Sequence, residues 1–145
     1  MTTQAAQAAR QERRQAVPEP LWQGDCFTAA LYELLPCFRD GTRPDLRYVD
    51  GLLLVHGLVT GQGRIAGIRH LHAWVETDAD ENGLVLVLDT SNGGYILTER
   101  AKYYHFGRVV EQQLQRYTAK EALALVLSSG HCGPWNEELE ALQDV

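Results

Sequence analysis

The sequence predicts a single α+β domain in which one helix near its start and another near its end flank a run of antiparallel strands. Apolar residues recur at helical spacing after Asp25 and again after Thr118. Between these segments lie apolar stretches of strand length, joined by short connections that contain Gly and Asn. Short connections favour antiparallel pairing, and the order helix, strands, helix is typical of the α+β class.

The chain of 145 residues has the length of one domain, but its first segment differs in composition. Residues 1–20 are rich in Ala and Gln and end in Pro18-Glu19-Pro20. Because this segment has too few apolar side chains for a core face, we expect a frayed helix or a disordered arm. The alternative is an arm that docks on a second copy of the chain and gives a homo-oligomer. Residues 21–145 are then the single folded domain.

The first helix is predicted to begin after Asp25, a residue type favoured at N-caps, and to end at Pro36. Its apolar positions follow helical spacing: Phe27, Ala30, Leu31, Leu34 and Leu35. Residues 38–47 are expected to be a loop. This helix therefore has one apolar face that can pack on a sheet.

Strands are predicted at five places in the middle of the chain: 47–60, 69–77, 84–90, 95–97 and 109–117. The first has either a turn or a bulge at Asp50-Gly51, and Asn82-Gly83 is a hairpin signal between the second and the third. Residues 61–67 are expected to form a flexible connection, and residues 99–105 either a short helix or a loop.

The last helix is predicted from Thr118 to Ser128. Thr118 and Glu121 have the spacing of a capping box, and Gly130 is a typical residue at a helix C-terminus. Residues 133–145 are expected to hold a last turn and an acidic tail.

Charge and composition exclude several classes of protein. The formal net charge is −6, so attraction to nucleic acid or to an anionic membrane is not expected. No apolar run approaches the ~20 residues of a membrane span, and no basic segment followed by an apolar one opens the chain. Three cysteines, an odd number, argue against a complete disulfide framework. We therefore expect a cytoplasmic protein with free thiols.

Cys26 is the cysteine best placed to be a nucleophile, because it falls in the first turn of the predicted helix. The partial positive charge of a helix N-terminus favours the thiolate, and the backbone N–H of Cys26 can stabilise an oxyanion. The neighbouring Asp25 opposes the thiolate unless its carboxylate caps the helix. Cys37 lies at the other end of the helix, and Cys132 lies in a Gly-rich loop.

His72 is the histidine best suited to be the base. Strand alternation places His70, His72 and Trp74 on one face, where the large aromatic ring shields the imidazole from water. Asp89 ends the next apolar strand, and it is either a turn-former or the carboxylate that orients His72. The other histidines are expected to be a hydrogen-bonded core residue, His56, and two surface residues, His105 and His131.

Three segments together resemble the transglutaminase-like superfamily. Gly24-Asp25-Cys26-Phe27-Thr28-Ala29-Ala30 resembles its G-x-C-aromatic-x-x-A helix start, and His72-Ala73-Trp74-Val75-Glu76 is similar to its H-x-W-x-E strand. Val87-Leu88-Asp89-Thr90 resembles the D-x-[TS] segment that completes the pattern. The resemblance implies a papain-like core over roughly residues 21–117, with the cysteine helix packed on an antiparallel sheet.

The resemblance also implies a reaction. A Cys26–His72–Asp89 triad would form an acyl-thioester with a peptide, a protein or a small amide, and water or an amine would then release the acyl group. Hydrolysis is the expectation, because a small open cleft admits water. The second oxyanion donor is expected to be Gln23 or Trp22, with Trp74 as a further residue of the oxyanion or substrate site. No cofactor is expected, because Asp78-Ala79-Asp80-Glu81 lacks calcium-ligand spacing.

Three other interpretations remain open at this point. His70, His72, His131 and Cys132 have the ligand types of a zinc site. The same fold can also serve as a non-catalytic binding module, or catalyse acyl transfer from a thioester donor as arylamine N-acetyltransferases do. The aromatic residues after the triad either line a substrate groove or pack the sheet: Tyr95, Tyr103, Tyr104, Tyr117 and Trp135.

Overall fold

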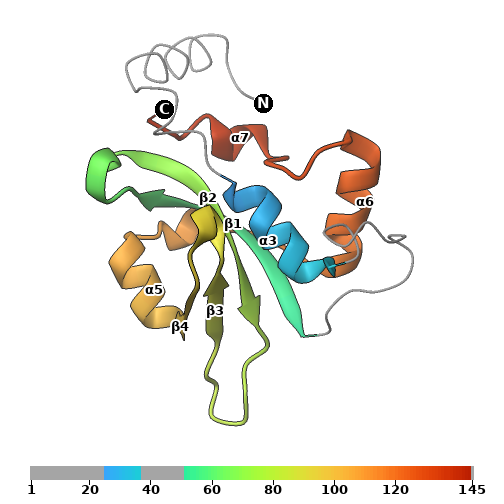
Figure 1. Ribbon diagram of the computed structural model, residues 1–145, viewed down its shortest axis with the longest axis horizontal. Coiled ribbons are helices and arrows are strands. Elements are labelled where there is room, and N and C mark those ends of the chain that lie inside the picture. Colours follow the sequence, from blue (N-terminus) through green and yellow to red (C-terminus); the bar gives the residue numbers. More distant parts are fainter. Residues whose placement is uncertain (1–24, 37–50, 145) are drawn as a thin grey trace.

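The structure is a computed structural model that describes residues 25–36 and 51–144 (Figure 1). Several predictions concern residues outside these ranges, namely the arm at 1–20, the donors Trp22 and Gln23, Cys37 and the loop at 38–47. Within the described residues the order is one helix, a series of strands with a helix among them, and two further helices.

Five antiparallel strands form one sheet, which confirms the α+β class. They are β1 (Leu52–Thr60), β2 (Arg69–Thr77), β3 (Leu86–Asp89), β4 (Ile96–Glu99) and β5 (Gln115–Tyr117). Their order across the sheet is β4-β3-β2-β1-β5. The bounds of β2 are those that the sequence predicts. In the register of β1 on β2, Gly57 lies opposite His72 and His56 lies opposite Ala73.

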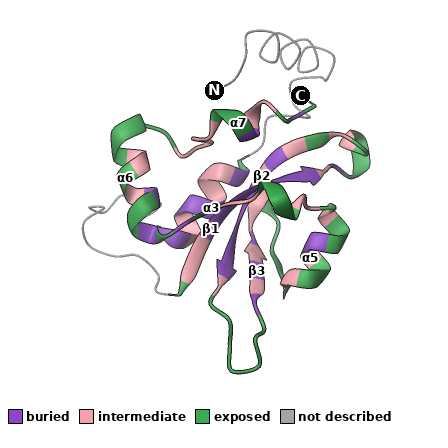
Figure 2. Cartoon of the chain, turned by 180° about the vertical axis from the view of Figure 1, so that it is seen from behind, coloured by how far each residue is buried: buried purple, intermediate pink, exposed green. Residues whose placement is uncertain are grey.

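One face of the sheet is covered by α3 (Cys26–Leu34) and α6 (Ala119–Ser129) (Figures 1 and 2). Their apolar side chains form the largest buried cluster with residues of β1 and β2: Leu31, Leu34, Leu54, Ala73, Val75 and Ala122. The short helix α7 (Glu137–Glu140) adds Leu139, which packs with Leu58 and Leu71. The cysteine-bearing helix therefore packs on the antiparallel sheet.

The opposite face of the sheet is covered by α5 (Arg100–Gly107). Tyr104 of this helix packs with Trp74 and with three valines of the sheet: Val55, Val59 and Val87. Gly57 is needed on this face, because a Cβ there would lie 2.8 Å from Cη2 of Trp74 and 2.4 Å from Cδ2 of Leu114. Residues 99–105, expected to be a helix or a loop, are thus mostly helical.

Two predicted strands are shorter in the structure. Instead of a continuous strand over 109–117, the backbone N–H of Val110 bonds Leu58 of β1, residues Glu111–Gln113 form a 3₁₀ turn (η3), and ladder pairing with β1 starts at Gln115. The turn itself interrupts the strand, because the N–H of Gln113 bonds the carbonyl of Val110 within the chain and not a residue of β1. The predicted strand at 84–90 is reduced to β3, because the turn around Asp80 includes Leu84, whose N–H bonds the Asp80 side chain.

The capping box of the last predicted helix is confirmed. Thr118 Oγ1 accepts the N–H of Glu121, and the Glu121 side chain accepts the N–H of Thr118. Gly130 ends α6 with φ of 78°, a conformation that Gly adopts at little cost. Among the described residues, no helix is both long enough and apolar enough to cross a membrane.

Candidate active site

The candidate site lies where β3 separates from β2. Pairing between these strands covers only Val75 and Glu76 of β2, so the part of β2 that carries His70 and His72 is not paired with β3. The chain leaves β3 after Asp89 and forms a short 3₁₀ turn, η2 (Ser91–Gly93), which contacts α3. Asp89 and the first turn of α3 thereby approach His72 from two sides.

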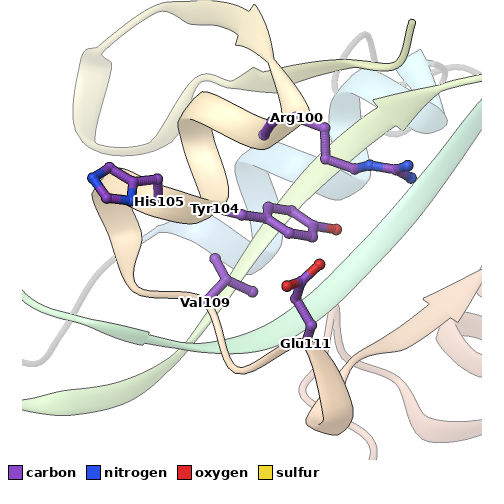
Figure 3. Close-up of a pocket in the computed structure, with 6 residues that line it drawn as sticks. Arg100, Tyr104, His105, Val109 and Glu111 are labelled. Atoms are coloured by element: carbon purple, nitrogen blue, oxygen red, sulfur yellow. The ribbon is translucent and has the colours of Figure 1, made fainter. Parts of the chain in front are cut away.

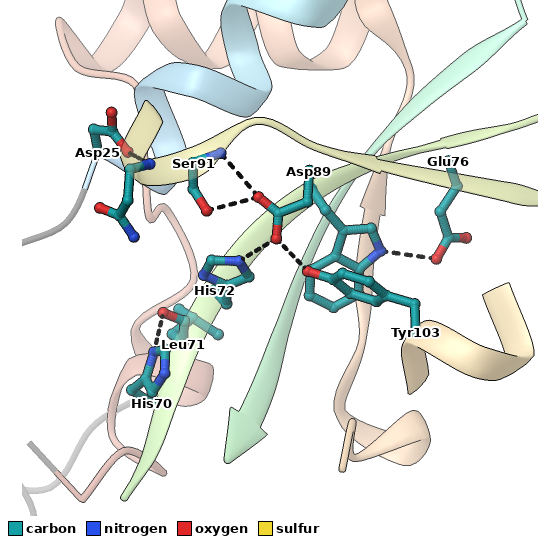
Figure 4. Close-up of polar contacts among 10 residues, drawn as sticks. Asp25, His70, Leu71, His72, Glu76, Asp89, Ser91 and Tyr103 are labelled. Carbon is teal, nitrogen blue, oxygen red and sulfur yellow. Dashed lines mark hydrogen bonds and ion pairs between the residues drawn. The ribbon is translucent and has the colours of Figure 1, made fainter. Parts of the chain in front are cut away.

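His72 is held between Asp89 and Cys26. Its Nε2 lies 2.8 Å from Oδ2 of Asp89 (Figure 4), and Cys26, at the start of α3, is close enough to raise the pKa of the ring. Since Nε2 is bound to Asp89, Nδ1 is the ring nitrogen left for the thiol. Burial lowers the pKa of His72, but the hydrogen bonds and negative charges of Asp89 and Cys26 outweigh it and raise the pKa to about 10.

Asp89 accepts hydrogen bonds on both carboxylate oxygens. Besides His72, Oδ2 accepts the hydroxyl of Tyr103 at 2.6 Å. Oδ1 accepts the backbone N–H of Ser91 at 3.0 Å and its hydroxyl at 2.6 Å. Burial raises the pKa of Asp89, but the bond and charge of His72, with Ser91 and Tyr103, bring the pKa well below its usual range. Asp89 thus both forms the turn and bonds the imidazole.

Cys26 is 7% exposed and occupies the first position of α3. The preceding Asp25 does not cap this helix with its side chain, in contrast to the sequence-based prediction. Its Oδ1 instead accepts the backbone N–H of Asn92 in η2 at 2.6 Å. The side chain of Asp25 therefore leaves the N–H groups of the first turn uncapped, as an oxyanion donor at Cys26 requires.

Trp74 stacks beside His72, with ring centroids 6.2 Å apart and planes inclined by 29°. The ring is fully buried, and its Nε1–H donates to Oε2 of Glu76 at 3.0 Å (Figure 4). The indole is therefore neither an oxyanion donor nor a substrate contact, contrary to the expectation for this residue. Its place is behind the imidazole, where it excludes water.

Glu76 is a buried carboxylate that sequence reasoning did not single out as a functional residue. Its side chain is 2% exposed, and Tyr104 donates its hydroxyl to the same oxygen that accepts Trp74. Arg116 and Arg100 lie 3.4 and 3.7 Å from the other oxygen. The available signal was its position on the same strand face as His72 and Trp74, where a charged residue needs buried partners.

His56 is the core residue that the sequence predicts, but it is not hydrogen-bonded within the described residues. It is 1% exposed, and neither ring nitrogen has a partner. Instead, aromatic rings of Phe27, Tyr117 and Trp135 surround it at centroid distances of 4.9 to 5.3 Å. Burial, with a smaller contribution from the charge of His72, lowers the pKa of His56 to about 3, so the ring is neutral.

The zinc interpretation does not fit the described residues. No group of three or more His, Cys, Asp or Glu side chains is arranged there to hold a metal ion. His70 lies edge-on to His72 and directs Nδ1 to the carbonyl of Leu71. His131 is exposed and its Nδ1 accepts the N–H of Gly133, so it does not converge with the β2 histidines.

The aromatic residues after the triad mostly pack the sheet rather than form one groove. Tyr103 and Tyr104 lie on one face, and Tyr117 and Trp135 on the other, whereas Tyr95 is 72% exposed. Two cavities involve members of this set. Tyr117 and Trp135 line one of about 540 Å³, and Tyr104 lines one of about 430 Å³ with residues that Figure 3 labels.

Comparisons of this chain with models of known protein families, with curated proteins and with solved structures find no match.

Proposed function

We propose that this protein is a cysteine-dependent amide or peptide hydrolase of the transglutaminase-like, papain-like type. Cys26 is the nucleophile, His72 the acid and base, and Asp89 the residue that orients the imidazole. One observation carries the proposal, namely that the buried His72 ring is bonded to the Asp89 carboxylate while Cys26, at the N-terminus of α3, acts on the same ring. The raised pKa of His72 favours an imidazolium beside a thiolate, which is the reactive form of such a pair.

The first half of the reaction transfers the acyl group to sulfur. The Cys26 thiolate attacks the carbonyl carbon, and the backbone N–H of Cys26 donates to the oxyanion that forms. As the intermediate collapses, the C–N bond breaks and the imidazolium of His72 gives its proton to the leaving amine. The products of this half are the free amine, a thioester on Cys26 and a neutral imidazole.

The second half is hydrolysis. The neutral His72 removes a proton from a water molecule, whose oxygen attacks the thioester carbonyl. The C–S bond then breaks, which releases the carboxylic acid and restores the thiolate beside the imidazolium. Water is the proposed acceptor because it needs no binding site of its own, whereas transamidation needs a site for an amine.

The arrangement of the elements agrees with the papain-like expectation in three respects. The cysteine lies at the N-terminus of a helix, this helix packs on an antiparallel sheet, and the histidine and aspartate come from neighbouring strands of that sheet. The H-x-W-x-E motif also has a physical basis, because Trp74 packs against His72 and is bound to Glu76. These features support the proposal beside the three motifs.

The test is the pH dependence of iodoacetamide alkylation at each cysteine, located by peptide mass spectrometry. We expect Cys26 to react faster than Cys132 below about pH 7, and to lose this advantage in His72→Ala. Cys26→Ser is the control that assigns the fast reaction to this cysteine. His105→Ala replaces an exposed histidine and is the matched control for His72→Ala. Equal reactivity of Cys26 and Cys132 in the folded protein would contradict the proposal and favour a non-catalytic binding module on the same fold.

Turnover is tested with p-nitrophenyl acetate, an activated ester that needs little substrate binding. We expect a burst of nitrophenol from acylation of Cys26, followed by a slower steady rate from hydrolysis of the thioester. Hydroxylamine in the solution distinguishes the acceptors, since a transamidase partitions the acyl group mainly to the amine. A burst that persists in Cys26→Ser would exclude this cysteine as the nucleophile.

A further inference from the structure

Two adjacent tyrosines of α5 bind two different buried carboxylates. Tyr103 donates its hydroxyl to Asp89, and Tyr104 donates its hydroxyl to Glu76. Figure 4 shows Tyr103 reaching Asp89 from α5, across the sheet face that also carries His72. Because α5 packs on the face opposite α3, this contact reaches the triad from the side away from Cys26.

The contact of Tyr103 is directed at the oxygen that binds the imidazole. Oδ2 of Asp89 accepts both the Tyr103 hydroxyl at 2.6 Å and Nε2 of His72 at 2.8 Å, whereas Ser91 occupies the other oxygen. Burial, then the charge of Asp89, raises the pKa of Tyr103, so its hydroxyl stays protonated and remains a donor. Tyr103 is thus a permanent donor to the orienting carboxylate.

In the proposed reaction Asp89 loses the positive charge beside it, and the Tyr103 hydroxyl stabilises the carboxylate when this happens. Asp89 is 6% exposed, and its charge is balanced by the imidazolium of His72 in the resting pair. After His72 has given its proton to the leaving amine, a buried carboxylate faces a neutral ring. Such a carboxylate is costly unless hydrogen bonds stabilise it, and without them it tends to take a proton itself.

We propose that Tyr103 is a positioning residue that keeps Asp89 a carboxylate while His72 is neutral, in the hydrolytic half of the reaction. The catalytic role given to Tyr103 rests on the proposed function. The effect of its hydroxyl on the Asp89–His72 pair can be measured without that function. With the hydroxyl present, the carboxylate tolerates the loss of the neighbouring positive charge. Without it, His72 holds its proton more tightly, so at a given pH a smaller fraction of the ring is neutral and able to accept a proton from water.

Other titratable groups also act on the Asp89–His72 pair, and their charges must be the same in all the proteins that the test compares. Cys26 on α3 is the largest variable among them, since its hydrogen bond and charge both act on His72. The charge of His72 also acts on histidines of the two central strands, His70 on β2 and His56 on β1, and on α5 Tyr104 acts on Tyr103. Replacement of Cys26 by Ser removes the ionisable sulfur and reproduces the charge state of the acyl-enzyme, in which sulfur is uncharged.

The experiment measures the pKa of His72 by NMR of the imidazole carbon and nitrogen shifts in three proteins. They are Cys26→Ser, the same protein with Tyr103→Phe, and the same protein with Tyr104→Phe. We expect Tyr103→Phe to raise the pKa of His72 by about 0.5 to 1 pH unit. Tyr104→Phe is the matched control, because it deletes the neighbouring hydroxyl from Glu76 and should leave the pKa of His72 unchanged.

An unchanged or lowered pKa of His72 in the Tyr103→Phe protein would overturn the inference. A similar rise in both phenylalanine variants would also overturn it, since the effect would then reflect general loosening of α5. With Cys26 present, Tyr103→Phe should keep the p-nitrophenyl acetate burst and move the acidic limb of the steady rate to higher pH. If wild-type protein gives no burst, the proposed function fails while the NMR comparison still decides the role of Tyr103.

Discussion

Asp25 Oδ1 accepts the backbone N–H of Asn92 at 2.6 Å, across 67 positions of the sequence. This bond joins the residue before the candidate nucleophile to the turn that follows the candidate orienting carboxylate. Ser91, in the same turn, donates twice to Asp89. One three-residue turn therefore connects Cys26 and Asp89, and changes in its position will affect both.

The Asp25 contact can be tested by comparing Asp25→Ala with Asp25→Asn. Ala removes the acceptor and should lower the free energy of unfolding by about 1 kcal/mol, whereas Asn retains an acceptor oxygen and should lose less. Both variants remove the negative charge next to Cys26, so a difference between them reports the bond to Asn92. Urea denaturation provides the measurement, and equal stabilities would show that this bond contributes nothing.

Replacement of Glu76 should destabilise the protein strongly. Glu76→Ala leaves the buried donors of Trp74 and Tyr104 without an acceptor and opens a cavity, so we expect a loss of about 2–4 kcal/mol. Arg116→Ala should cost less than about 1 kcal/mol, because this arginine is 40% exposed and water screens its charge. Denaturation of both variants decides the point, and the opposite ranking would refute the account of this network.

The His72–Asp89 pair should make stability fall as the pH rises above neutrality. Because the pKa of His72 is raised from 6.5 to about 10, the folded protein binds more protons than the unfolded chain between these values. The contribution of His72 to the free energy of unfolding is complete below pH 6.5 and disappears as the pH approaches 10. Asp89 has its effect on the acid side. Its lowered pKa stabilises the folded protein, and this stabilisation is lost as the pH falls below 3.8.

His72→Gln tests this pH dependence. The variant should lose most of the decline in unfolding free energy between pH 6.5 and about 10, measured by urea denaturation at several pH values. His105→Gln, which changes an exposed histidine, should keep it. A decline of the same slope in His72→Gln would assign the effect to other groups.

His56 should be replaceable by an apolar residue with a gain in stability. Among residues 25–36 and 51–144 both ring nitrogens are buried without partners, so His56→Leu removes a desolvation cost, and we expect a gain of about 1 kcal/mol at neutral pH. The lowered pKa of His56 also predicts how this gain changes with pH. The unfolded chain binds a proton below 6.5 that the folded protein does not bind until about pH 3, so the gain should increase as the pH falls. A loss of stability at every pH would indicate that the imidazole has a partner.

Local sequence signals predicted the elements that carry the three candidate catalytic residues. Alternation along β2 placed His72 and Trp74 on one face, and helical spacing after Asp25 placed Cys26 at a helix start. Both depend on near neighbours in the sequence, for which residue periodicity is informative. The register that brings Asp89 toward His72 pairs Val75 with Leu88 and Glu76 with Val87, on either side of the connection at 78–85 that contains the predicted hairpin signal.

The surroundings of the triad were not predictable in the same way. Tyr103 and Glu76 acquire their partners because α5 packs on the second face of the sheet, and nothing local encodes that choice. The side chain of Asp25 has the chemistry of an N-cap but bonds a turn far away in the sequence. The strand expected at 109–117 is interrupted by the 3₁₀ turn at Glu111–Gln113, in a segment whose apolar residues suggest β-structure.

The adjacent hydroxyls of α5 also set a lower limit on the length of any fragment that keeps the surroundings of the triad. A fragment that ends before Arg100 retains Cys26, His72 and Asp89 but strips two interior carboxylates of their tyrosine donors. Recombinant pieces, split-protein designs and domain fusions should therefore be cut beyond this helix. Deletion of Ala101 or Lys102, which precede both tyrosines in this helix, rotates the following side chains by about 100° and separates both tyrosines from their carboxylates together.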